Sequence, residues 1–532
     1  MGSRIIITTR NERLLVEHGI TLYHNVEVLN DDEALALFSL HAFKKNMPED
    51  GFLELSECFI KYAGGLPLAL KTFGSALFKR GLDFWNSKRD NLSKIPNTEI
   101  IHKLKISYDE LEEMEKSIFL DVAYLHKGKY RMEVIEILDI SFGISSSTMI
   151  DVLIERSLLY HDCNKYIWMH DLIQDMAREI VRQESKEPGQ RSRLWLYDDI
   201  DQIFRKNKGT AAIEAISLRL SNVEEVPQWN CEAFSKMERL RFLEFNNLIF
   251  SSGPKSLPCS LRIINWSWYP SNFLPTSFHP HFLGKLEMRN SNLVRFLGGK
   301  VDLPNLKHID LSNSNKLKST LDFNGLPNLE ELYLSACMNL VEIHPSIAVL
   351  KRLKVLHLCD CESIKSLPSK VEMDSLVDFN LGGCSNVKTI PEFGEQMKNL
   401  SSLTLDNTAI EKIPSSIGHV VDLWRFSLRE CKNLLYLPRA ICNLKSLKWL
   451  DVGRCSKIDK LPEDMDHLSW LIVGPTMTKP FVGMKNLKVL IFEATTNCLE
   501  FMAIRNDLRP IGIHALNICI TWLSRGAKQP IN

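Results

Sequence analysis

The sequence predicts an α+β multidomain protein in which a mostly helical first part is followed by a solenoid of short strands. Three observations support this fold class. The 532 residues exceed what one hydrophobic core usually serves. Leucines in the second half recur at nearly constant steps, and the first half carries apolar residues at helical spacing. We therefore expect several domains, built by different folding rules in the two halves.

The repeat is visible as leucines at steps of 23 and 24 residues: Leu306, Leu329, Leu353, Leu376, Leu400, Leu423 and Leu447. Each leucine opens a phrase such as Leu329-Glu-Glu-Leu332-Tyr-Leu334. Alternate residues of a strand share one face, so each phrase buries its leucines on one side. One copy cannot bury its own core, and copies must stack. The pattern predicts a curved leucine-rich-repeat solenoid over residues 211–495, followed by an irregular tail over 496–532.

A cysteine stands near the end of most of these phrases: Cys337, Cys361, Cys384, Cys431 and Cys455, with Thr408 in the same place of one copy. A small, weakly polar side chain there can turn inward and meet backbone groups. A structural zinc site favours C-x-x-C pairs, which this sequence does not contain. The column therefore predicts a packing role and no metal site. Thirteen cysteines without an apolar leader favour a cytoplasmic protein, with the nucleus as the alternative.

The charge balance bears on the partner. Lys and Arg number 65, as do Asp and Glu, so no global basic field favours nucleic acid. No apolar run is long enough to cross a bilayer. A protein is therefore the expected partner, bound by strand residues that point away from the solenoid core. The residues that we assign to this concave surface are Asp310, Tyr333, His357, Asn380, Thr404, Asp406, Ser427, Arg429 and Asp451.

The first part of the chain shows a different pattern. Residues 3–9 are apolar and β-branched, which predicts a buried strand. Asn30 precedes an acidic helical start and predicts a capped helix. Helical spacing then continues, interrupted by a turn at residues 64–68, to about Gln183. Residues 184–193 are polar, contain Pro and Gly, and predict a linker.

Four motifs of this first part occur in a familiar order: GSRIIITTR at 2–10, GGLPLAL at 64–70, KISYDELEEMEKSIFLDV at 105–122 and MHDLIQDMAREIVRQES at 169–185. Together with the cysteine-type repeats, they resemble plant intracellular immune receptors of the class with an N-terminal TIR domain, the disease resistance proteins that join a nucleotide-binding region to leucine-rich repeats. The resemblance implies the following domains: the end of a nucleotide-binding α/β domain (1–29), a helical module (30–98), a winged-helix module (99–185), a linker (186–210) and the repeats.

The resemblance also implies a function and a nucleotide site. Such receptors recognise a pathogen effector or a guarded host protein through their repeats and switch between ADP and ATP. Arg10 resembles the arginine that approaches the terminal phosphates, Pro67 the proline that packs on adenine, and His170 the histidine that contacts the β-phosphate of ADP. The repeats are expected to contact the winged-helix module, and only intact, activated relatives are expected to form oligomers.

The family's phosphate loop, G-x-x-x-x-G-K-[ST], has no match in this sequence. We therefore expect a receptor fragment without the phosphate-loop half of the nucleotide-binding domain and without the TIR domain. Such a fragment would neither hydrolyse ATP nor cleave NAD, and would have no catalytic residue. The run Ile118-Phe-Leu-Asp121, which ends in an acid, is interpreted as core packing. Two alternatives stay open: a switch that still holds ADP through Arg10, Pro67 and His170, and an adaptor or decoy that binds protein through the repeats alone.

Overall fold

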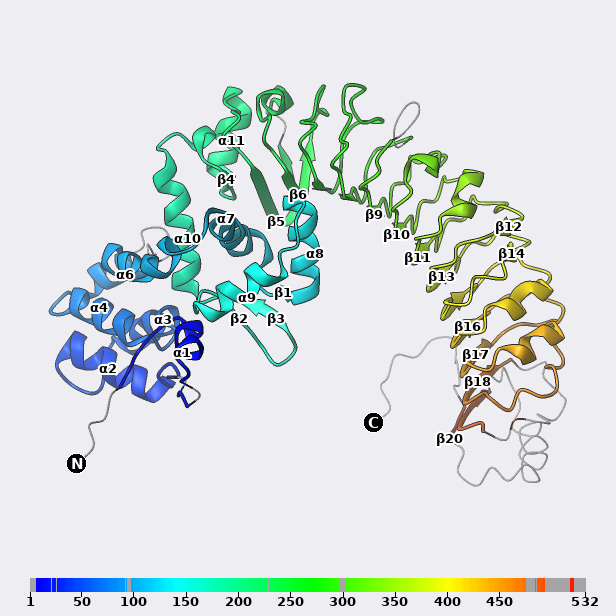
Figure 1. The fold of residues 1–532 in the computed structure, drawn as a ribbon, viewed down its shortest axis with the longest axis horizontal. Coiled ribbons are helices and arrows are strands. Elements are labelled where there is room, and N and C mark those ends of the chain that lie inside the picture. Colours follow the sequence, from blue (N-terminus) through cyan, green and yellow to red (C-terminus); the bar gives the residue numbers. More distant parts are fainter. Residues whose placement is uncertain are drawn as a thin grey trace. The chain divides into compact units, whose positions relative to one another are not determined.

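The computed structural model describes residues 6–20, 22–24, 26–90, 92, 97–226, 229–295, 302–474, 484, 486–492 and 517–520 (Figure 1). The chain forms two compact units. The first unit comprises Met1–Ile200 and Ala212–Ser217, and the second comprises Asp201–Ala211 and Leu218–Asn532. The first unit contains two hydrophobic cores, and the second unit has a core of its own.

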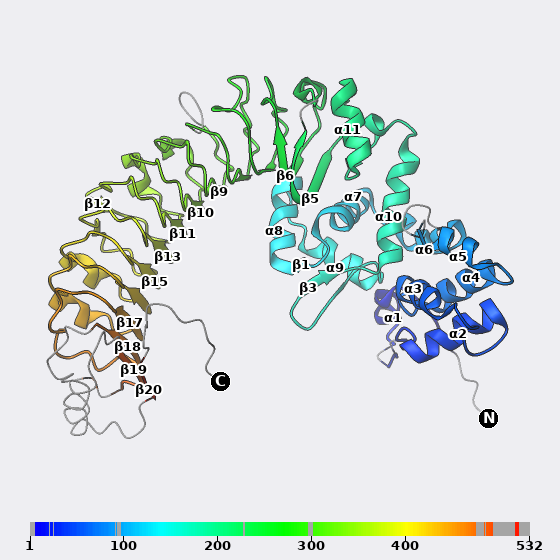
Figure 2. The ribbon, with the colours of Figure 1, turned by 180° about the vertical axis from the view of Figure 1, so that it is seen from behind.

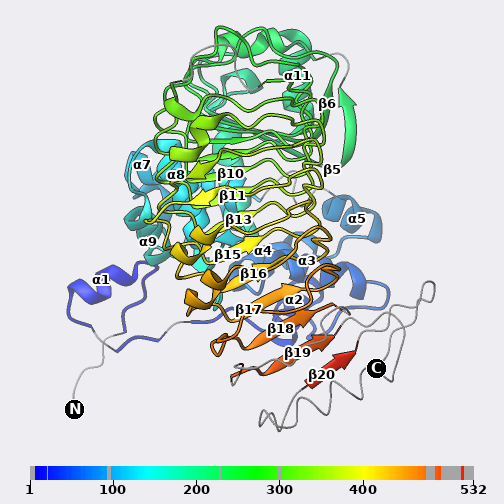
Figure 3. The ribbon, with the colours of Figure 1, turned by 90° about the vertical axis from the view of Figure 1, so that its right-hand side faces the viewer.

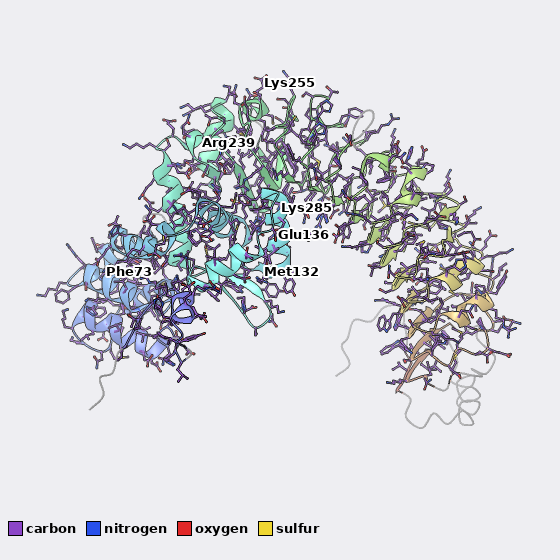
Figure 4. The ribbon with its side chains drawn as sticks, in the orientation of Figure 1. Phe73, Met132, Glu136, Arg239, Lys255 and Lys285 are labelled. Atoms are coloured by element: carbon purple, nitrogen blue, oxygen red, sulfur yellow. The ribbon has the colours of Figure 1, made fainter. Side chains whose placement is uncertain are left out.

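The first helices of the first unit pack around an aromatic cluster. They are α1 (Glu12–Glu17), α2 (Asp31–Phe43), α3 (Leu53–Ala63), α4 (Pro67–Leu77) and α5 (Leu82–Asp90). The Trp85 ring stands edge-on to Phe38 and Phe59, with ring centres 5.9 and 5.8 Å apart, and Phe73, labelled in Figure 4, borders the cluster. The capped start of α2 is confirmed: the Asn30 side chain accepts the Glu33 amide proton, and Glu33 accepts that of Asn30.

The strand predicted at residues 3–9 is wrong for the part that the structure describes. Residues 6–9 belong to no strand, and Ile6 is 89 % exposed. A strand needs a neighbour to satisfy its backbone groups, and no described segment pairs with these residues. Residues 3–5 lie outside the described residues.

A second core of the same unit forms the winged-helix module. Its elements are α6 (Thr98–Asp109), α7 (Glu113–Asp121), η1 (Val122–His126), β1 (Lys129–Tyr130), α8 (Arg131–Phe142), α9 (Ser147–Glu155), β2 (Tyr160–His161), β3 (Tyr166–Trp168) and α10 (Asp171–Glu184). The strands form an antiparallel sheet in the order β1-β3-β2, and α10 packs on α6 (Figure 2). Ile118, Phe119, Leu120 and Asp121 are buried on α7, which confirms the interpretation of this run as core.

The segment 186–210, predicted as a linker, contains regular structure: η2 (Pro188–Gln190), β4 (Arg193–Leu194) and α11 (Tyr197–Lys206). Arg193 is buried, and its guanidinium has four partners: Asp121 at 3.1 Å, the Ser192 hydroxyl at 2.8 Å, the Ser117 carbonyl at 3.4 Å and Glu214 at 3.7 Å. Residues 186–200 thus belong to the first compact unit, and residues 201–210 to the second.

The second unit is a solenoid with one parallel sheet along its inner side (Figures 1 and 3). Its strands run in chain order: β5 (Ala215–Val226), β6 (Phe242–Phe250), β7 (Ile263–Trp266), β8 (Lys285–Glu287), β9 (His308–Asp310), β10 (Glu331–Tyr333), β11 (Val355–His357), β13 (Asp378–Asn380), β15 (Ser402–Thr404), β16 (Arg425–Ser427), β17 (Trp449–Val452), β18 (Trp470–Val473), β19 (Val489–Phe492) and β20 (Asn517–Ile520). The leucines of the repeated phrases are buried in its core. β20 lies within 496–532, where an irregular tail was predicted; for residues 517–520 that prediction is wrong, since they pair with β19.

The outer side of the solenoid carries short elements. They are the 3-10 turns η3 (Cys231–Lys236), η4 (Phe323–Gly325), η5 (Pro345–Val349), η6 (Ser415–His419) and η7 (Arg439–Asn443), and the strand pair β12 (Lys370–Val371) and β14 (Glu392–Phe393). Figure 1 shows β12 and β14 on the side opposite to β11 and β13. These turns bring the chain back to the start of the next strand.

The cysteine column forms a ladder between repeats. The thiols of Cys361, Cys384 and Cys455 each donate over 3.0 Å to a leucine carbonyl one repeat earlier, Leu334, Leu358 and Leu428 respectively. Cys337 and Cys431 do the same. Burial raises the pKa of Cys384 to about 12 and that of Cys431 to about 11, which keeps both thiols protonated as donors. The described residues contain no disulfide and no metal-ligand cluster.

In the described ranges, no single helix is long and apolar enough to cross a bilayer. Only when α8 and α9 are taken together do their length and composition reach what a bilayer span requires, and these two helices are bent by 118° relative to one another.

Candidate functional site: the His170 turn and the concave sheet

His170 occupies the N-cap of α10, where its ring fixes the start of that helix. The Leu172 amide donates to Nδ1 over 3.1 Å. Because Nδ1 accepts, the proton of a neutral ring lies on Nε2. Burial lowers the pKa of His170, so the neutral ring is the form favoured near neutral pH.

The other edge of the His170 ring lies against the turn between α3 and α4. A Cβ placed on Gly64 would come within 2.3 Å of His170 Nε2, and Gly64 has a left-handed φ of +55°. Two motifs about a hundred residues apart in sequence therefore meet, and the meeting requires glycine. Nε2 is buried and makes no hydrogen bond of ordinary geometry, but it faces the backbone of Gly64 and Ala63, which raises the pKa of His170 against the effect of burial. The edge of the ring that carries the Nε2 proton is therefore directed at the Gly64 turn.

The two other residues predicted to bind the nucleotide, Pro67 and Arg10, are exposed, and no hydrogen bond among the described residues joins either of them to His170. Pro67 is the first residue of α4, three positions after Gly64, and it is exposed. Arg10 is exposed and donates from its guanidinium to the Lys103 carbonyl over 3.0 Å, while its own carbonyl accepts from the Ser157 hydroxyl. The structure thus brings His170 to the turn that carries Pro67 and gives Arg10 a backbone partner on α6.

The concave sheet of the second unit carries the predicted partner-binding positions. Tyr333, His357, Asn380, Thr404, Asp406 and Arg429 are partly exposed on this face. Adjacent strands pair in strict register, for example Tyr333 with His357 and Asn380 with Thr404. These side chains therefore form continuous columns across neighbouring repeats.

Three predicted positions, Asp310, Ser427 and Asp451, are not exposed as expected: each is at most 4 % exposed. Asp310 receives the Arg289 guanidinium at 2.6 Å and the Ser312 amide at 2.9 Å. Asp451 receives the Gly453 amide at 2.8 Å, and the Ser427 hydroxyl donates to Asp406 at 2.5 Å. These side chains close the turn after each strand, and neighbouring repeats cover them.

Sequence reasoning missed a column of strand residues that lie two positions before Asp310, Tyr333 and His357. It comprises Lys285, His308, Glu331, Val355, Asp378, Ser402, Arg425, Trp449 and Trp470 (Lys285 is labelled in Figure 4). Alternate residues of a strand point to the same face, so Glu331 had to accompany Tyr333. The two-residue period of the strand is the signal that would have found it.

At the N-terminal end of this column, carboxylates of acidic residues pair with the imidazole rings of histidines. His308 Nδ1 lies 2.8 Å from Glu331 and its Nε2 3.4 Å from Glu287. Burial opposes protonation, but the two hydrogen-bonded acids raise the pKa of His308 above its ordinary value. Burial alone would raise the pKa of Glu287, but the hydrogen bonds and charges of His308 and Lys285 lower this pKa to about 2. His357 pairs with Asp378 at 2.9 Å.

Comparisons with known proteins match the winged-helix module to a family and most of the chain to individual relatives. Residues 112–185 match the family described as Disease resistance protein Roq1-like, winged-helix domain. The chain is 35 % identical over 528 residues to TMV resistance protein N of Nicotiana glutinosa, covering 97 % of this chain and 45 % of that protein. Disease resistance protein RUN1 of Vitis rotundifolia is 38 % identical, with 66 % and 28 % covered. Disease resistance protein RPS6 of Arabidopsis thaliana is 30 % identical, with 95 % and 49 % covered.

Among solved structures, a leucine-rich-repeat protein of Leptospira interrogans is 20 % identical, with 59 % of this chain and 91 % of that chain covered at a TM-score of 0.31. A domain of InlJ from Listeria monocytogenes, described as including a cysteine ladder, is 13 % identical, with 57 % and 73 % covered at a TM-score of 0.35. The chain spans less than half the length of the curated relatives named above. By its winged-helix match and its relatives, the chain belongs to the plant disease resistance proteins that join a nucleotide-binding region to leucine-rich repeats.

Proposed function

We propose that this chain serves plant innate immunity as the sensing part of a disease resistance receptor, and that its repeats recognise a pathogen effector or a guarded host protein. The observation that carries the proposal is the continuous concave sheet, whose partly exposed columns change chemistry from repeat to repeat on a constant leucine and cysteine framework. A constant framework with a variable inner surface suits recognition of proteins. The chain would work in the cytoplasm, with the nucleus as the alternative compartment, and its repeats would restrain the winged-helix module.

The test is genetic. In the plant of origin, the stretch of gene that encodes this chain is disrupted and then restored, and leaves are challenged with a panel of pathogens. We expect resistance with local cell death toward at least one pathogen, lost on disruption and regained on restoration. An unchanged response to every pathogen in both lines would contradict the proposal. Neither ATP hydrolysis nor NAD cleavage by the purified chain is expected, and measurable turnover of either would contradict that part.

A second candidate function, nucleotide binding, is favoured by the contact of His170 with the turn that carries Pro67. Bound ADP or ATP would lie beside this turn, and a phosphate oxygen would accept the Nε2 proton in place of the Ala63 and Gly64 backbone. In calorimetric titration of the full chain with ADP, we expect binding that His170→Ala abolishes and that His161→Ala, an exposed histidine of the same unit, leaves unchanged. Absence of heat in the wild-type chain would favour the adaptor or decoy that works through its repeats alone.

A further inference from the structure

Three side chains toward the C-terminal end of the concave sheet form a surface that we name the tryptophan row: Arg425, Trp449 and Trp470. They are the first residues of β16, β17 and β18, which lie next to one another in Figure 3. Strand pairing sets Arg425 beside Trp449 and Trp449 beside Trp470.

The tryptophan row is not part of the solenoid core. Phe426, Leu450 and Leu471, the next residues of the same strands, are fully buried, so the row lies on the opposite face of the sheet. Trp470 is 40 % exposed and Trp449 is partly exposed. Large aromatic rings gathered on one surface gain free energy when a partner removes them from water.

Arg425 gives the row its charge. Its guanidinium stacks over the Trp449 ring, 4.5 Å from the ring centre, and it has no carboxylate within ion-pair distance among the residues that the structure describes. The neighbouring cations differ, since Arg429 lies 3.8 Å from Asp451 and Arg454 lies 2.8 Å from Glu430. A guanidinium held in place by stacking keeps its hydrogen-bonding edge available for a carboxylate.

Two acids lie near this cation without forming an ion pair with it. The charge of Arg425 acts to lower the pKa values of Asp378 and Asp406. Their hydrogen bonds come from other groups: His357 at 2.9 Å from Asp378, and the Ser427 hydroxyl and the Arg429 amide for Asp406. Arg425 therefore has no direct carboxylate partner among the described residues, in contrast to the paired histidines and acids at β8–β13.

We propose that the tryptophan row binds a segment of a partner protein that presents an aspartate or glutamate beside a bulky apolar side chain. The carboxylate would receive the Arg425 guanidinium, and the apolar side chain would cover Trp449 and Trp470. Tryptophan and arginine dominate the energetics of protein interfaces when a partner buries them. A basic segment would offer no carboxylate to Arg425 and would be repelled by its charge. The inference rests on the proposed function and adds to it the chemistry of the recognised surface.

The probe is a phage-displayed library of random twelve-residue peptides, selected on the purified full chain. We expect enrichment of peptides with Asp or Glu next to Trp, Phe or Leu, and lower affinity of the best peptide for Arg425→Gln and for Trp470→Ala by about tenfold or more. Trp268→Ala is the matched control, since Trp268 is an exposed tryptophan of another repeat, at 36 %. Circular dichroism verifies that each variant folds.

Two results would overturn the proposal: enrichment of basic or uncharged peptides, or affinity that neither tryptophan-row variant changes. Sedimentation of the wild-type chain as a dimer that Trp470→Ala dissociates would also overturn it, because the occupant would be a second copy. The plant assay separates the two proposals. If peptide selection fails while resistance is still lost on disruption and regained on restoration, only this inference falls. An unchanged response in both lines removes the proposed function whatever the peptides show.

Discussion

In the first unit one buried guanidinium, Arg193, serves four partners, whereas in the second unit five thiols each serve a single carbonyl of the preceding repeat. The first arrangement concentrates polar stabilisation at one point, and the second distributes it along the solenoid. We infer that a single substitution can unsettle the whole winged-helix module, while in the repeats its effect stays near the altered strand. Four predictions test this contrast.

The largest effect is expected for Arg193→Met. The change leaves Asp121, which is fully buried, without its cation, and losing one member of a buried pair costs about 3–5 kcal/mol. Urea denaturation of the full chain should show a lower free energy of unfolding for the first unit. The control is Arg89→Met, which removes an exposed pair with Asp90 and should be nearly neutral. If Asp121→Asn does not restore stability to the Arg193→Met variant, the loss of stability does not come from the unpaired charge of Asp121.

Gly64→Ala is expected to rank second, at about 1–2 kcal/mol, because φ is left-handed and the new methyl group would meet His170 Nε2. The ring can move only by giving up its contact with the turn, so the imidazole NMR signals of His170 should shift. Gly81→Ala serves as control, since a Cβ there meets nothing within 4 Å. Equal effects of the two substitutions would mean that the meeting of the two motifs contributes no stability.

Cys384→Ala should lower the free energy of unfolding by about 1–2 kcal/mol, because packing is lost and the Leu358 carbonyl loses its hydrogen-bond donor. Amide hydrogen exchange should accelerate in β11, β13 and β15 and stay unchanged in the first unit. Cys359→Ala, which alters a partly exposed cysteine of the concave face, provides the comparison and should change little. Faster exchange throughout the chain would refute the distributed view of the repeats.

The smallest effect, about 1 kcal/mol, concerns pH and the His308 pair with Glu287 and Glu331. The raised pKa of His308 gives stability that is fully present below about pH 6.5 and is lost as pH rises through the folded pKa. The lowered pKa values of Glu287 and Glu331 give stability that is present above about pH 4.5 and lost in acid. Protection of β9 and β10, corrected for intrinsic exchange, should therefore peak between about pH 5 and 6.

His308→Gln should flatten this pH profile, while His281→Gln, at an exposed position outside the strands, should preserve it. A profile that stays peaked in the His308→Gln variant would assign the pH dependence to other groups.

The sequence alone predicted those features that depend on local spacing. The leucine period placed the parallel strands, Asn30 and Glu33 marked the start of α2, and the cysteine column indicated inward-facing thiols. It failed where burial depends on distant partners. Arg193 stands in a polar stretch, and its burial requires Asp121, 72 residues away, while Asp310 is covered because Arg289 of the previous repeat reaches it. The contact of His170 with the turn at Gly64 likewise joins distant parts of the sequence, which local spacing does not reveal.

The turn that ends each strand has a consequence for how such a chain changes over generations. The residue before the cysteine position is left-handed in successive repeats, as at Asn313, Ala336, Asp360, Glu430 and Arg454. Every repeat therefore ends with the same backbone geometry and offers the same carbonyl to the next thiol. A duplication or loss of 23 or 24 codons joins two compatible ends and leaves the ladder continuous. Unequal crossing-over can thus lengthen, shorten or reorder the inner surface while each remaining column keeps its register.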